Sequence, residues 1–499
     1  MVCARFWENK RFVPQDVFQT HFSTRGKDAD SVAKFSSVKK WNVKGEAAEV
    51  YGILKEAGTV AVLSVERKET VQEAPLLYDL TALQKDANAR HGFTAEKTLA
   101  IAQKLYESKL ITYPRTGSRY IPEDVFAGIP SLLKGLKGNP KWDAVAGQLR
   151  ELNRRSVDDT KVTDHHALLP TGVKPLLFSK EDTAIYDMIV ARMLEAFSGK
   201  CVKDVTTVKA GCGGVEFVAK GNVVKQYGWR SVRNEKEEGE DNVVLPEWKE
   251  GDILPIMGCS LTEGKTKPKP FHTEATLLAA METAGKEVED EVMRQAMKDC
   301  GIGTPATRAA IIETLLKREY IVRSKKSLVP TEKGLALYSI VRGMDIANVE
   351  MTGQWEAALA KIEHGELPAE AFMRDIEAYT RKITTELLAS DKIFGHKASG
   401  CACPKCGKGT MQFYGKVVRC DNPECALPVF RQIAGKTLTD GEMTDLLTEG
   451  KTGVLGGFKS RQGKPFSAAV AFDADFNTNF IFPEAKGARK GTNMKGKRK

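Results

Sequence analysis

Hydrophobic residues recur at two different spacings along this chain. Between residues 80 and 109, apolar side chains such as Leu80, Leu83 and Ala87 recur every three or four positions. This stretch is therefore predicted to form two amphipathic helices. Between residues 199 and 261, short valine-rich runs are separated by glycines, a pattern that predicts strands. The chain is expected to combine helical and strand-rich parts in a multi-domain α+β fold.

A second helical stretch in the later half is followed by a basic hairpin. Thr273 precedes one apolar helical segment and Gly303 precedes another. Residues 320–330 are predicted to form a hairpin with Lys325 and Lys326 near its turn. A helix followed by a basic hairpin is typical of winged-helix DNA-binding domains. A capped core helix followed by a plain hairpin would give the same pattern.

The helix predicted after Gly303 also carries candidate phosphate-binding residues. Its first backbone N–H groups have no partner inside the helix, so they can bind an anion. The hydroxyl of Thr307 and the guanidinium of Arg308 lie in the same turn. We predict that Thr307, Arg308, Lys325 and Lys326 contact DNA phosphates.

The overall composition is that of a soluble protein with several domains. The chain has 499 residues, of which 42% are hydrophobic, and no apolar run reaches the roughly 18 residues needed to span a membrane. A cytoplasmic protein with no membrane contact is expected. The formal net charge is +10, and residues 486–499 contain seven Lys or Arg and no acid. We predict that this basic tail is disordered, either as an arm that contacts phosphate or as a solubilising tail.

The cysteines are distributed unevenly. Five of the ten lie between residues 401 and 425. Cys403, Cys406, Cys420 and Cys425 have the spacing C-x2-C-x13-C-x4-C, which suits tetrahedral Zn²⁺ held by four thiolates. A zinc ribbon is predicted here, with a ribbon that has lost its metal as the alternative.

Tyr113 is the strongest candidate for catalytic chemistry. An apolar run at residues 110–112 ends at Tyr113, and Pro114 disfavours a helical conformation for the tyrosine. In an extended segment Arg115 lies on the same face as Tyr113. A guanidinium favours the phenolate and binds phosphate oxygens, as attack on a phosphodiester requires. The alternative is a packed tyrosine at the end of a buried strand.

The segment Ile-Thr-Tyr-Pro-Arg-Thr-Gly-Ser-Arg-Tyr at residues 111–120 resembles the active-site segment of type IA DNA topoisomerases, and most closely that of bacterial DNA topoisomerase III. The resemblance implies that Tyr113 forms a 5′-phosphotyrosyl bond with single-stranded DNA and that Arg115 assists at the scissile phosphate. Gly117 is a small departure, because the family often has an acidic residue there.

Residues 163–171 resemble a second motif of the family, His-x-Ala-Ile-x-Pro-Thr/Ser. The resemblance implies that His165 assists cleavage, whereas His166 falls on a variable position and is given no role. Residues 452–466 resemble the C-terminal repeat that follows topoisomerase III cores.

Residues 79–88 are similar to a Leu-Gln-containing helix that lies near bound DNA in the family. The resemblance makes Gln84 and Asn88 candidates for DNA contact. Ordinary amides on a helix surface would fit the same pattern.

One part of the family pattern is missing from the sequence. Type IA enzymes also use a Toprim domain, which binds Mg²⁺ through an Asp-x-Asp-x-Glu cluster, and no such cluster occurs at a predicted strand end. Mg²⁺ is therefore expected to act through a Toprim domain that is not present in this chain, as in a fragment or with Toprim supplied in trans. We expect the chain alone to bind single-stranded DNA but to relax supercoils poorly.

These observations lead to a predicted architecture and function. The predicted domains are residues 1–72 (the end of a preceding domain and the first part of a β-rich arch), 73–195 (an inserted α-rich domain with the active-site tyrosine), 196–265 (the second part of the arch), 266–392 (a helical winged-helix-like domain), 398–431 (a zinc ribbon with four cysteine ligands), 432–485 (a small α/β C-terminal repeat) and 486–499 (the basic tail). The predicted activity is ATP-independent cleavage, strand passage and religation. The alternatives are a non-catalytic single-stranded-DNA-binding fragment and a winged-helix transcription factor.

Overall fold

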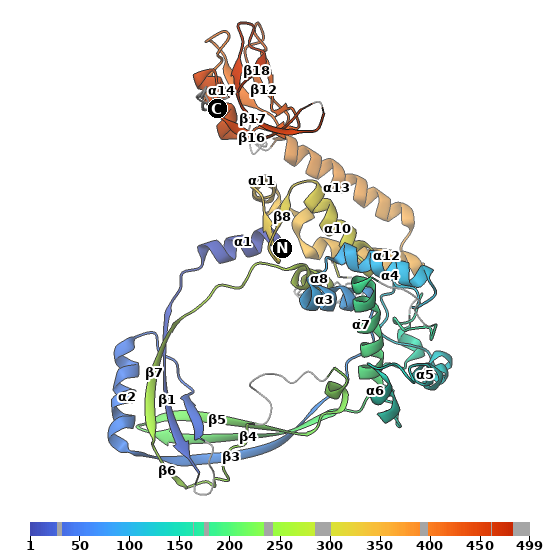
Figure 1. Cartoon of the computed structure of the whole chain (residues 1–499), viewed down its shortest axis with the longest axis vertical. Coiled ribbons are helices and arrows are strands. Elements are labelled where there is room, and N and C mark those ends of the chain that lie inside the picture. Colours follow the sequence, from blue (N-terminus) through green and yellow to red (C-terminus); the bar gives the residue numbers. More distant parts are fainter. Residues whose placement is uncertain are drawn as a thin grey trace, which may run out of the picture. The chain divides into compact units, whose positions relative to one another are not determined.

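The computed structural model describes residues 1–26, 32–162, 164–173, 179–233, 243–284, 301–389, 398–460 and 462–482. The chain divides into two compact units, Met1–Phe372 and Met373–Lys499. Each unit is described separately below, and Figure 1 shows the elements of both. Among the described residues, no helix combines the length and apolar character that crossing a membrane requires. The basic tail predicted at residues 486–499 lies outside the described residues.

One seven-stranded antiparallel sheet in unit 1 has the strand order β6-β3-β4-β5-β2-β1-β7. Its strands are β1 (Asp16–Arg25), β2 (Val32–Ser37), β3 (Thr59–Gln72), β4 (Cys201–Cys212), β5 (Val215–Gln226), β6 (Ile253–Pro255) and β7 (Gly258–Lys265). The pairing of β3 with β4 runs from Ala61 opposite Gly211 to Gln72 opposite Cys201. The sheet therefore unites two stretches of chain that are separated by a helical insertion.

An aromatic core holds this sheet to helix α2 (Lys44–Ala57). The rings of Phe22 and Phe35 stack with centroids 4.7 Å apart, and Phe217 meets Phe22 edge-on at 5.4 Å. These side chains lie on one face because successive residues of a strand alternate between the two faces. Apolar burial on that face fixes the register of the strands.

The helical insertion between β3 and β4 carries the tyrosine segment. Its helices are α3 (Leu80–His91), α4 (Ala95–Glu107), α5 (Glu123–Gly135), α6 (Asp143–Gln148) and α7 (Lys180–Phe197), with the short 3₁₀ turn η1 (Asp159–Lys161). Side chains cap three of them: Asp79 caps α3, Thr94 caps α4 and Ser179 caps α7. Gly92 ends α3 with a φ of 69°, a left-handed conformation that favours glycine.

A second helical part of unit 1 follows the sheet. Its elements are α1 (Val2–Arg11), α8 (Glu274–Glu282), α10 (Pro305–Lys317), the hairpin strands β8 (Ile321–Ser324) and β9 (Ser327–Pro330), α11 (Glu332–Val341), the 3₁₀ turn η4 (Asp345–Ala347) and α12 (Val349–Glu363). Leu278, Ile312 and Leu328 are buried in its apolar core. The segment α10-β8-β9 is thus a helix followed by a hairpin.

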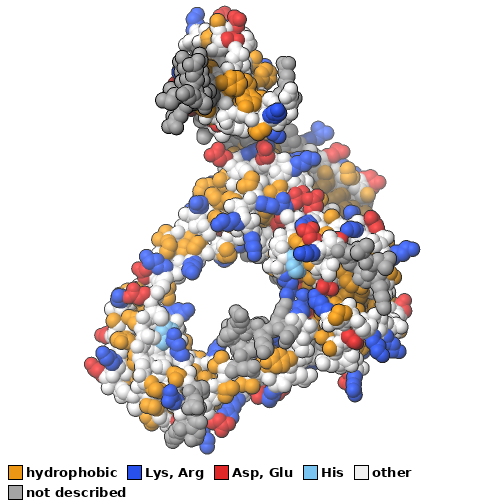
Figure 2. Space-filling view, in the orientation of Figure 1, with side chains coloured by type: hydrophobic (Ala, Val, Ile, Leu, Met, Phe, Trp, Pro, Cys, Tyr) orange, Lys and Arg blue, Asp and Glu red, His pale blue; other side chains and the backbone are white. Residues whose placement is uncertain are grey.

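The sheet and the helices of unit 1 border an open space in Figure 1. The space remains open when side chains are drawn (Figure 2). The short 3₁₀ turn η2 (Gly228–Ser231) follows β5 and packs against α7, where the sheet meets the helical insertion.

Unit 2 contains a four-stranded and a three-stranded sheet that share one apolar core, together with a two-stranded ribbon, β14-β15. Its elements are most of α13 (Ala369–Ala389), β10 (Ala398–Ala402), β11 (Thr410–Phe413), β12 (Val417–Cys420), β13 (Pro428–Phe430), β14 (Gln432–Ile433), β15 (Lys436–Thr437), α14 (Asp440–Glu449), β16 (Leu455–Lys459), β17 (Pro465–Phe472) and β18 (Thr478–Ile481). Met411 and Val418 of the first sheet belong to the same buried cluster as Phe458 and Val470 of the second. The two predicted parts, 398–431 and 432–485, are therefore packed together.

Candidate active site and four-cysteine cluster

The tyrosine segment begins where α4 ends. Lys109 turns the chain with a φ of 61°, and the N–H of Leu110 donates to the carbonyl of Leu105 at 3.0 Å. These bonds occupy carbonyl groups of the last helical turn that would otherwise have no partner. The chain therefore leaves the helix sharply, and Tyr113 follows four residues later.

Residues 110–112 pair with residues 169–171, which come much later in the sequence. The N–H of Thr112 donates to the carbonyl of Leu169 at 2.9 Å, and the N–H of Leu169 donates to the Thr112 hydroxyl at 3.0 Å. The N–H of Thr171 donates to the carbonyl of Leu110 at 3.0 Å. Backbone groups therefore fix the chain on the amino side of Tyr113.

The carboxyl side of Tyr113 is fixed in the same way. The hydroxyl of Thr116 donates to the carbonyl of His165 at 2.8 Å. The N–H of Ala167 donates to the carbonyl of Tyr120 at 2.9 Å, and the N–H of Leu80 donates to the carbonyl of Thr116 at 3.1 Å. These bonds bring His165 beside Tyr113 without using either functional side chain.

Tyr113 and His165 lie in contact. Their ring centroids are 4.4 Å apart with an interplanar angle of 52°. Tyr113 is half-buried, whereas His165 and Arg115 are exposed. The phenol is therefore not sealed in an apolar core, and the structure brings together the tyrosine and histidine that the sequence singled out. His166 instead places its Nδ1 2.8 Å from the carbonyl of Ala167.

Sequence reasoning missed a second aromatic neighbour of the tyrosine. Tyr106, in the last turn of α4, meets Tyr113 edge-on with ring centroids 5.3 Å apart. The only signal in the sequence was that Tyr106 stands seven residues before Tyr113. An edge-on ring restrains the orientation of Tyr113.

The first turn of α10 lies against the tyrosine segment. A Cβ added at Gly117 would meet the Pro305 ring at 3.4 Å. Thr304 caps α10 in a capping box with Thr307, and the hydroxyl of Thr307 accepts the N–H of Thr304 at 2.9 Å. Thr307 is exposed in this turn. The first turn of α10 is thus brought to within contact distance of the segment that carries Tyr113.

Arg308, which was predicted from the sequence to contact a DNA phosphate, is buried in this structure. Only 2% of this residue is exposed. Its guanidinium donates to the Thr81 hydroxyl at 2.9 Å and to the carbonyl of Ile302 at 3.3 Å. Arg308 therefore joins α10 to α3 in this conformation. Lys325 and Lys326, by contrast, are exposed at the turn of the β8-β9 hairpin.

Gln84 is also corrected by the structure, since it is fully buried rather than on a helix surface. Its amide donates to the carbonyl of Ala95 at 3.0 Å. Gln84 belongs to the apolar face that includes Leu83, and that face points inward. Asn88 donates to the carbonyl of Phe93 at 2.9 Å and accepts the N–H of Ala275 at 3.1 Å. Both amides are thus engaged with backbone groups.

Two further polar contacts join the helical insertion to α8. The Glu274 carboxylate, 4% exposed, accepts the N–H of Ala95 at 2.7 Å and pairs with Arg323 at 2.8 Å. Lys85 pairs with Glu282 at 2.7 Å. Together with Asn88 and Arg308, these groups form what we term the polar seam, which links α3 and α4 to α8 and α10.

Asp79 is a buried carboxyl next to the tyrosine segment. It caps α3 by accepting the N–H of Ala82 at 2.6 Å. Burial raises the pKa of Asp79 to about 6, because a charged carboxylate is poorly solvated there, although the Ala82 N–H and the Arg119 charge oppose the shift. The ionised form of Asp79 is therefore held at a cost in stability.

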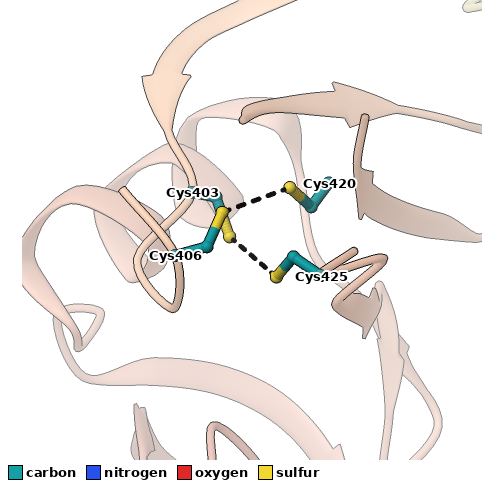
Figure 3. A group of neighbouring side chains, drawn as sticks. All are labelled: Cys403, Cys406, Cys420 and Cys425. Atoms are coloured by element: carbon teal, nitrogen blue, oxygen red, sulfur yellow. Dashed lines mark hydrogen bonds between the residues drawn. The ribbon is translucent and has the colours of Figure 1, made fainter. Parts of the chain in front are cut away.

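Four cysteine sulfurs in unit 2 converge on one point (Figure 3). The Sγ atoms of Cys403, Cys406, Cys420 and Cys425 all lie within 4.8 Å of one another. Cys403 lies 3.8 Å from Cys425, and Cys406 lies 3.7 Å from Cys420. Tetrahedral zinc with Zn–S bonds of about 2.3 Å requires sulfurs about 3.8 Å apart. The cluster is therefore compatible with zinc.

Backbone amides also point at two of these four sulfurs. The N–H of Gly409 points at the sulfur of Cys406 at 3.4 Å, and the N–H of Asn422 points at Cys420 at 3.4 Å. The amides of Gly409 and Lys408 lower the pKa of the Cys406 thiol. Among the described residues, these cysteines are the only group of three or more potential metal ligands.

The family models that match this chain cover both units. A model described as DNA topoisomerase matches residues 1–374. A model described as the C-terminal repeat of topoisomerase matches residues 424–483.

Curated relatives and a solved structure agree with these matches. DNA topoisomerase 3 of Bacillus licheniformis is 34% identical over 445 residues, which cover 85% of this chain and 60% of that protein. DNA topoisomerase 3 of Bacillus subtilis is 36% identical over 390 residues, which cover 74% of this chain and 53% of that protein. The chain thus spans little more than half the length of these relatives. Full-length topoisomerase I from Thermotoga maritima has a similar fold, with a TM-score of 0.56 at 19% identity over 97% of this chain and 68% of that one.

Proposed function

The chain belongs to the type IA DNA topoisomerase family, and we propose that it forms the strand-cleaving core of such an enzyme. It would cut one DNA strand through a 5′-phosphotyrosine bond, let another strand pass and reseal the break without ATP. Single-stranded DNA is the proposed substrate. The contact between Tyr113 and His165, beside an exposed Arg115, is the observation that carries the proposal.

The proposed cleavage is an exchange of one ester for another. The phenol oxygen of Tyr113 loses its proton and forms a bond to phosphorus, while the bond from phosphorus to the 3′-oxygen breaks and that oxygen takes up a proton. Arg115 would hold the non-bridging phosphate oxygens, and His165 would donate a hydrogen bond or pass a proton. Religation is the reverse, so the energy of the phosphodiester is retained.

The structure offers a reason for the position of the tyrosine. The segment around Tyr113 is fixed by backbone hydrogen bonds on both sides. A nucleophile held in this way does not need to be ordered again in each catalytic cycle, and such positioning lowers the barrier of a displacement reaction. The open side chain of Arg115 is then free to meet the phosphate.

Two metals belong to the proposal. Zn²⁺ would be held by Cys403, Cys406, Cys420 and Cys425 in a closed structural site. Mg²⁺ would be held by acidic residues of a Toprim domain, in the same or another polypeptide, since the described residues include no cluster of three acids. Lys325 and Lys326 would contact phosphates of the bound strand, as would Thr307.

Capture of a covalent adduct tests the proposal. The chain would be incubated with a single-stranded oligonucleotide and Mg²⁺, with and without a Toprim domain taken from a relative, then denatured and digested for mass spectrometry. We expect an adduct on Tyr113 that depends on the Toprim domain. Tyr113→Phe should abolish the adduct completely, because it removes the attacking oxygen.

Tyr106→Phe is the matched control, because Tyr106 lies against Tyr113 and also loses only a hydroxyl. It should retain the adduct. Salt-sensitive binding of DNA without any adduct would instead support a non-catalytic single-stranded-DNA-binding module. Preference for a duplex sequence would support a transcription factor.

A further inference from the structure

A basic pocket lies at the end of α3 that is farther from the tyrosine segment. Its volume is about 670 Å³, and it is bordered by the ends of α3 and α7, the chain before α6 and the chain after η2. The tyrosine segment bonds to Leu80 at the start of α3, whereas Arg90 and His91 of the pocket end that helix. At 1.5 Å per residue, about 16 Å of helix separates the two places. The pocket is therefore distinct from the site at Tyr113.

Positive charge dominates the polar lining of this pocket. The lining contains one acid, Asp187. The basic side chains are Arg90, His91, Lys141, Lys180 and Arg233. Lys141 pairs with Asp187 at 2.6 Å, so the one acid of the lining is already engaged. In Figure 2, Lys and Arg side chains gather on the border of the open space next to α3 and α7.

Arg233 has more hydrogen-bonding capacity than the described protein uses. One of its terminal nitrogens, Nη2, is buried without a hydrogen-bond partner. Its Nε pairs with Glu195, a carboxylate that also pairs with Arg192 at 3.0 Å. A buried donor without an acceptor is unfavourable by about 1–3 kcal/mol. Arg233 thus brings a positive charge to the border of the pocket, while its Nη2 itself is closed to solvent.

Lys180 occupies an unfavourable position for a cation. It is the first residue of α7, where the helix dipole is positive and favours acids. The side chain is exposed, so no packing requirement explains a lysine there. An anion next to the start of α7 would offset the unfavourable charge.

The pKa of His91 is lowered by burial and by the same group of positive charges. Burial lowers the pKa of His91, and the charges of Arg90, Arg233 and Lys141 lower it further. Three cations from separate parts of the chain therefore act on one imidazole. The lining also contains an apolar part, formed by Trp142, Val145, Met188 and Val232.

We propose that this pocket binds one nucleotide of single-stranded DNA, away from the bond cleaved at Tyr113. The phosphate would lie beside Lys180 at the start of α7, where the charges of Arg90 and Arg233 also favour an anion, and the sugar would lie on the apolar lining. Each phosphate contact of this kind strengthens binding and makes it more sensitive to salt. The proposal rests on the proposed function only in naming DNA as the source of the phosphate.

Lys180→Glu is the variant that tests the pocket. An acid is favourable at the first position of a helix, so this change should leave folding intact. Binding of a fluorescent single-stranded oligonucleotide would be followed by anisotropy at several salt concentrations. We expect affinity to fall about 5- to 10-fold and the salt slope to decrease by about 0.7, the value for one lost contact with a single strand. Lys180→Arg should restore both.

Lys44→Glu is the matched control, because Lys44 is also the first residue of a helix, α2, and changes the net charge equally. It should bind like the unaltered chain. A local readout comes from NMR titration of ¹³C-labelled His91, identified with His91→Gln. Bound oligonucleotide should raise the pKa of His91, because a phosphate would offset the three cations.

The outcomes separate the pocket from the proposed function. Binding that is unchanged in Lys180→Glu, with an unshifted His91, would overturn the pocket while leaving the adduct at Tyr113 as an independent test. A His91 shift with inorganic phosphate but not with the oligonucleotide would also overturn it. A chain that binds no oligonucleotide at all would contradict the proposed function.

Discussion

In the tyrosine segment, backbone groups up to 61 positions apart, as in Leu110 and Thr171, hold one another, and the side chains of Tyr113 and His165 remain accessible. In the four-cysteine cluster, the functional side chains themselves lie at the centre, and all four belong to or pack against the apolar core of unit 2. The side chains at the tyrosine site contribute little to the packing of the fold. The side chains of the four-cysteine cluster are themselves part of the packed interior.

Because of this difference, substitutions at the site in unit 1 should change function without changing stability, whereas substitutions at the site in unit 2 should change both. Removal of a reactive side chain from the tyrosine segment leaves its supporting hydrogen bonds intact. Removal of a sulfur from the cluster removes a ligand of the proposed zinc, on which we expect the local structure to depend. The same kind of substitution should therefore have opposite consequences in the two regions.

The largest expected effect on stability is in the cluster. Cys420→Ser should abolish zinc binding and unfold the segment around the four sulfurs, because structural zinc contributes an apparent 10–16 kcal/mol in small zinc domains. Zinc content by elemental mass spectrometry and hydrogen exchange of residues 398–433 would measure the two effects. Hydrogen exchange in unit 1 should not change.

Cys401→Ala provides the matched control for the cluster. Cys401 is buried near the four sulfurs but is not one of them. It should retain a full equivalent of zinc. If Cys420→Ser kept both its zinc and its exchange protection, the proposed dependence of this fold on the metal would be wrong.

Arg115→Ala should have a large effect on chemistry and almost none on stability. Loss of a group that stabilises developing charge typically slows a reaction by about 10²- to 10³-fold. Because Arg115 is exposed, the free energy of unfolding should change by less than about 0.5 kcal/mol. The adduct assay and a urea titration would measure the two quantities. A loss of stability with an unchanged rate of adduct formation would show that Arg115 supports the fold and not the reaction, which would contradict the comparison.

Asp79→Asn should have a smaller effect, and its sign depends on pH. The folded pKa of Asp79, about 6, lies above its ordinary value of 3.8. The folded state therefore holds the proton more tightly, and this contribution to stability is present below pH 4 and lost as the pH rises through 6. Asparagine preserves an acceptor for the cap without the charge.

We expect Asp79→Asn to stabilise the protein by about 1–2 kcal/mol at pH 8, somewhat less than the full value of a two-unit shift. It should also flatten the pH dependence between about 4 and 6. Urea titrations at several pH values would show both. Asp79→Ala, which loses the cap as well, should not gain this stability.

Local sequence signals predicted much of what the structure contains. The spacing of apolar residues predicted two helices between residues 80 and 109, and the structure has helices at 80–91 and 95–107, each of which buries one face. The spacing of the four cysteines indicated a cluster, because neighbouring ligands on tight turns must converge. The order of residues around Tyr113 indicated the site, through its resemblance to a family.

Long-range packing decided what the sequence could not. Gln84 and Arg308 are polar, and their identity alone favoured the surface. Their partners are the Ala95 carbonyl and the Thr81 hydroxyl, which only the folded chain brings near. The pairing of residues 110–112 with 169–171 is likewise invisible to any local pattern. Tyr106 lies only seven residues before Tyr113, but the contact between their rings depends on the turn at Lys109, which the sequence pattern did not predict.

The polar seam has a mechanical consequence. Water can take the place of each partner when Asn88 leaves Ala275 or when Lys85 leaves Glu282, and the buried charges of Glu274 and Arg308 gain hydration on exposure. An apolar interface of equal area would lose its hydrophobic stabilisation when exposed to water. An interface made of such polar contacts can open and close repeatedly at a lower free-energy cost.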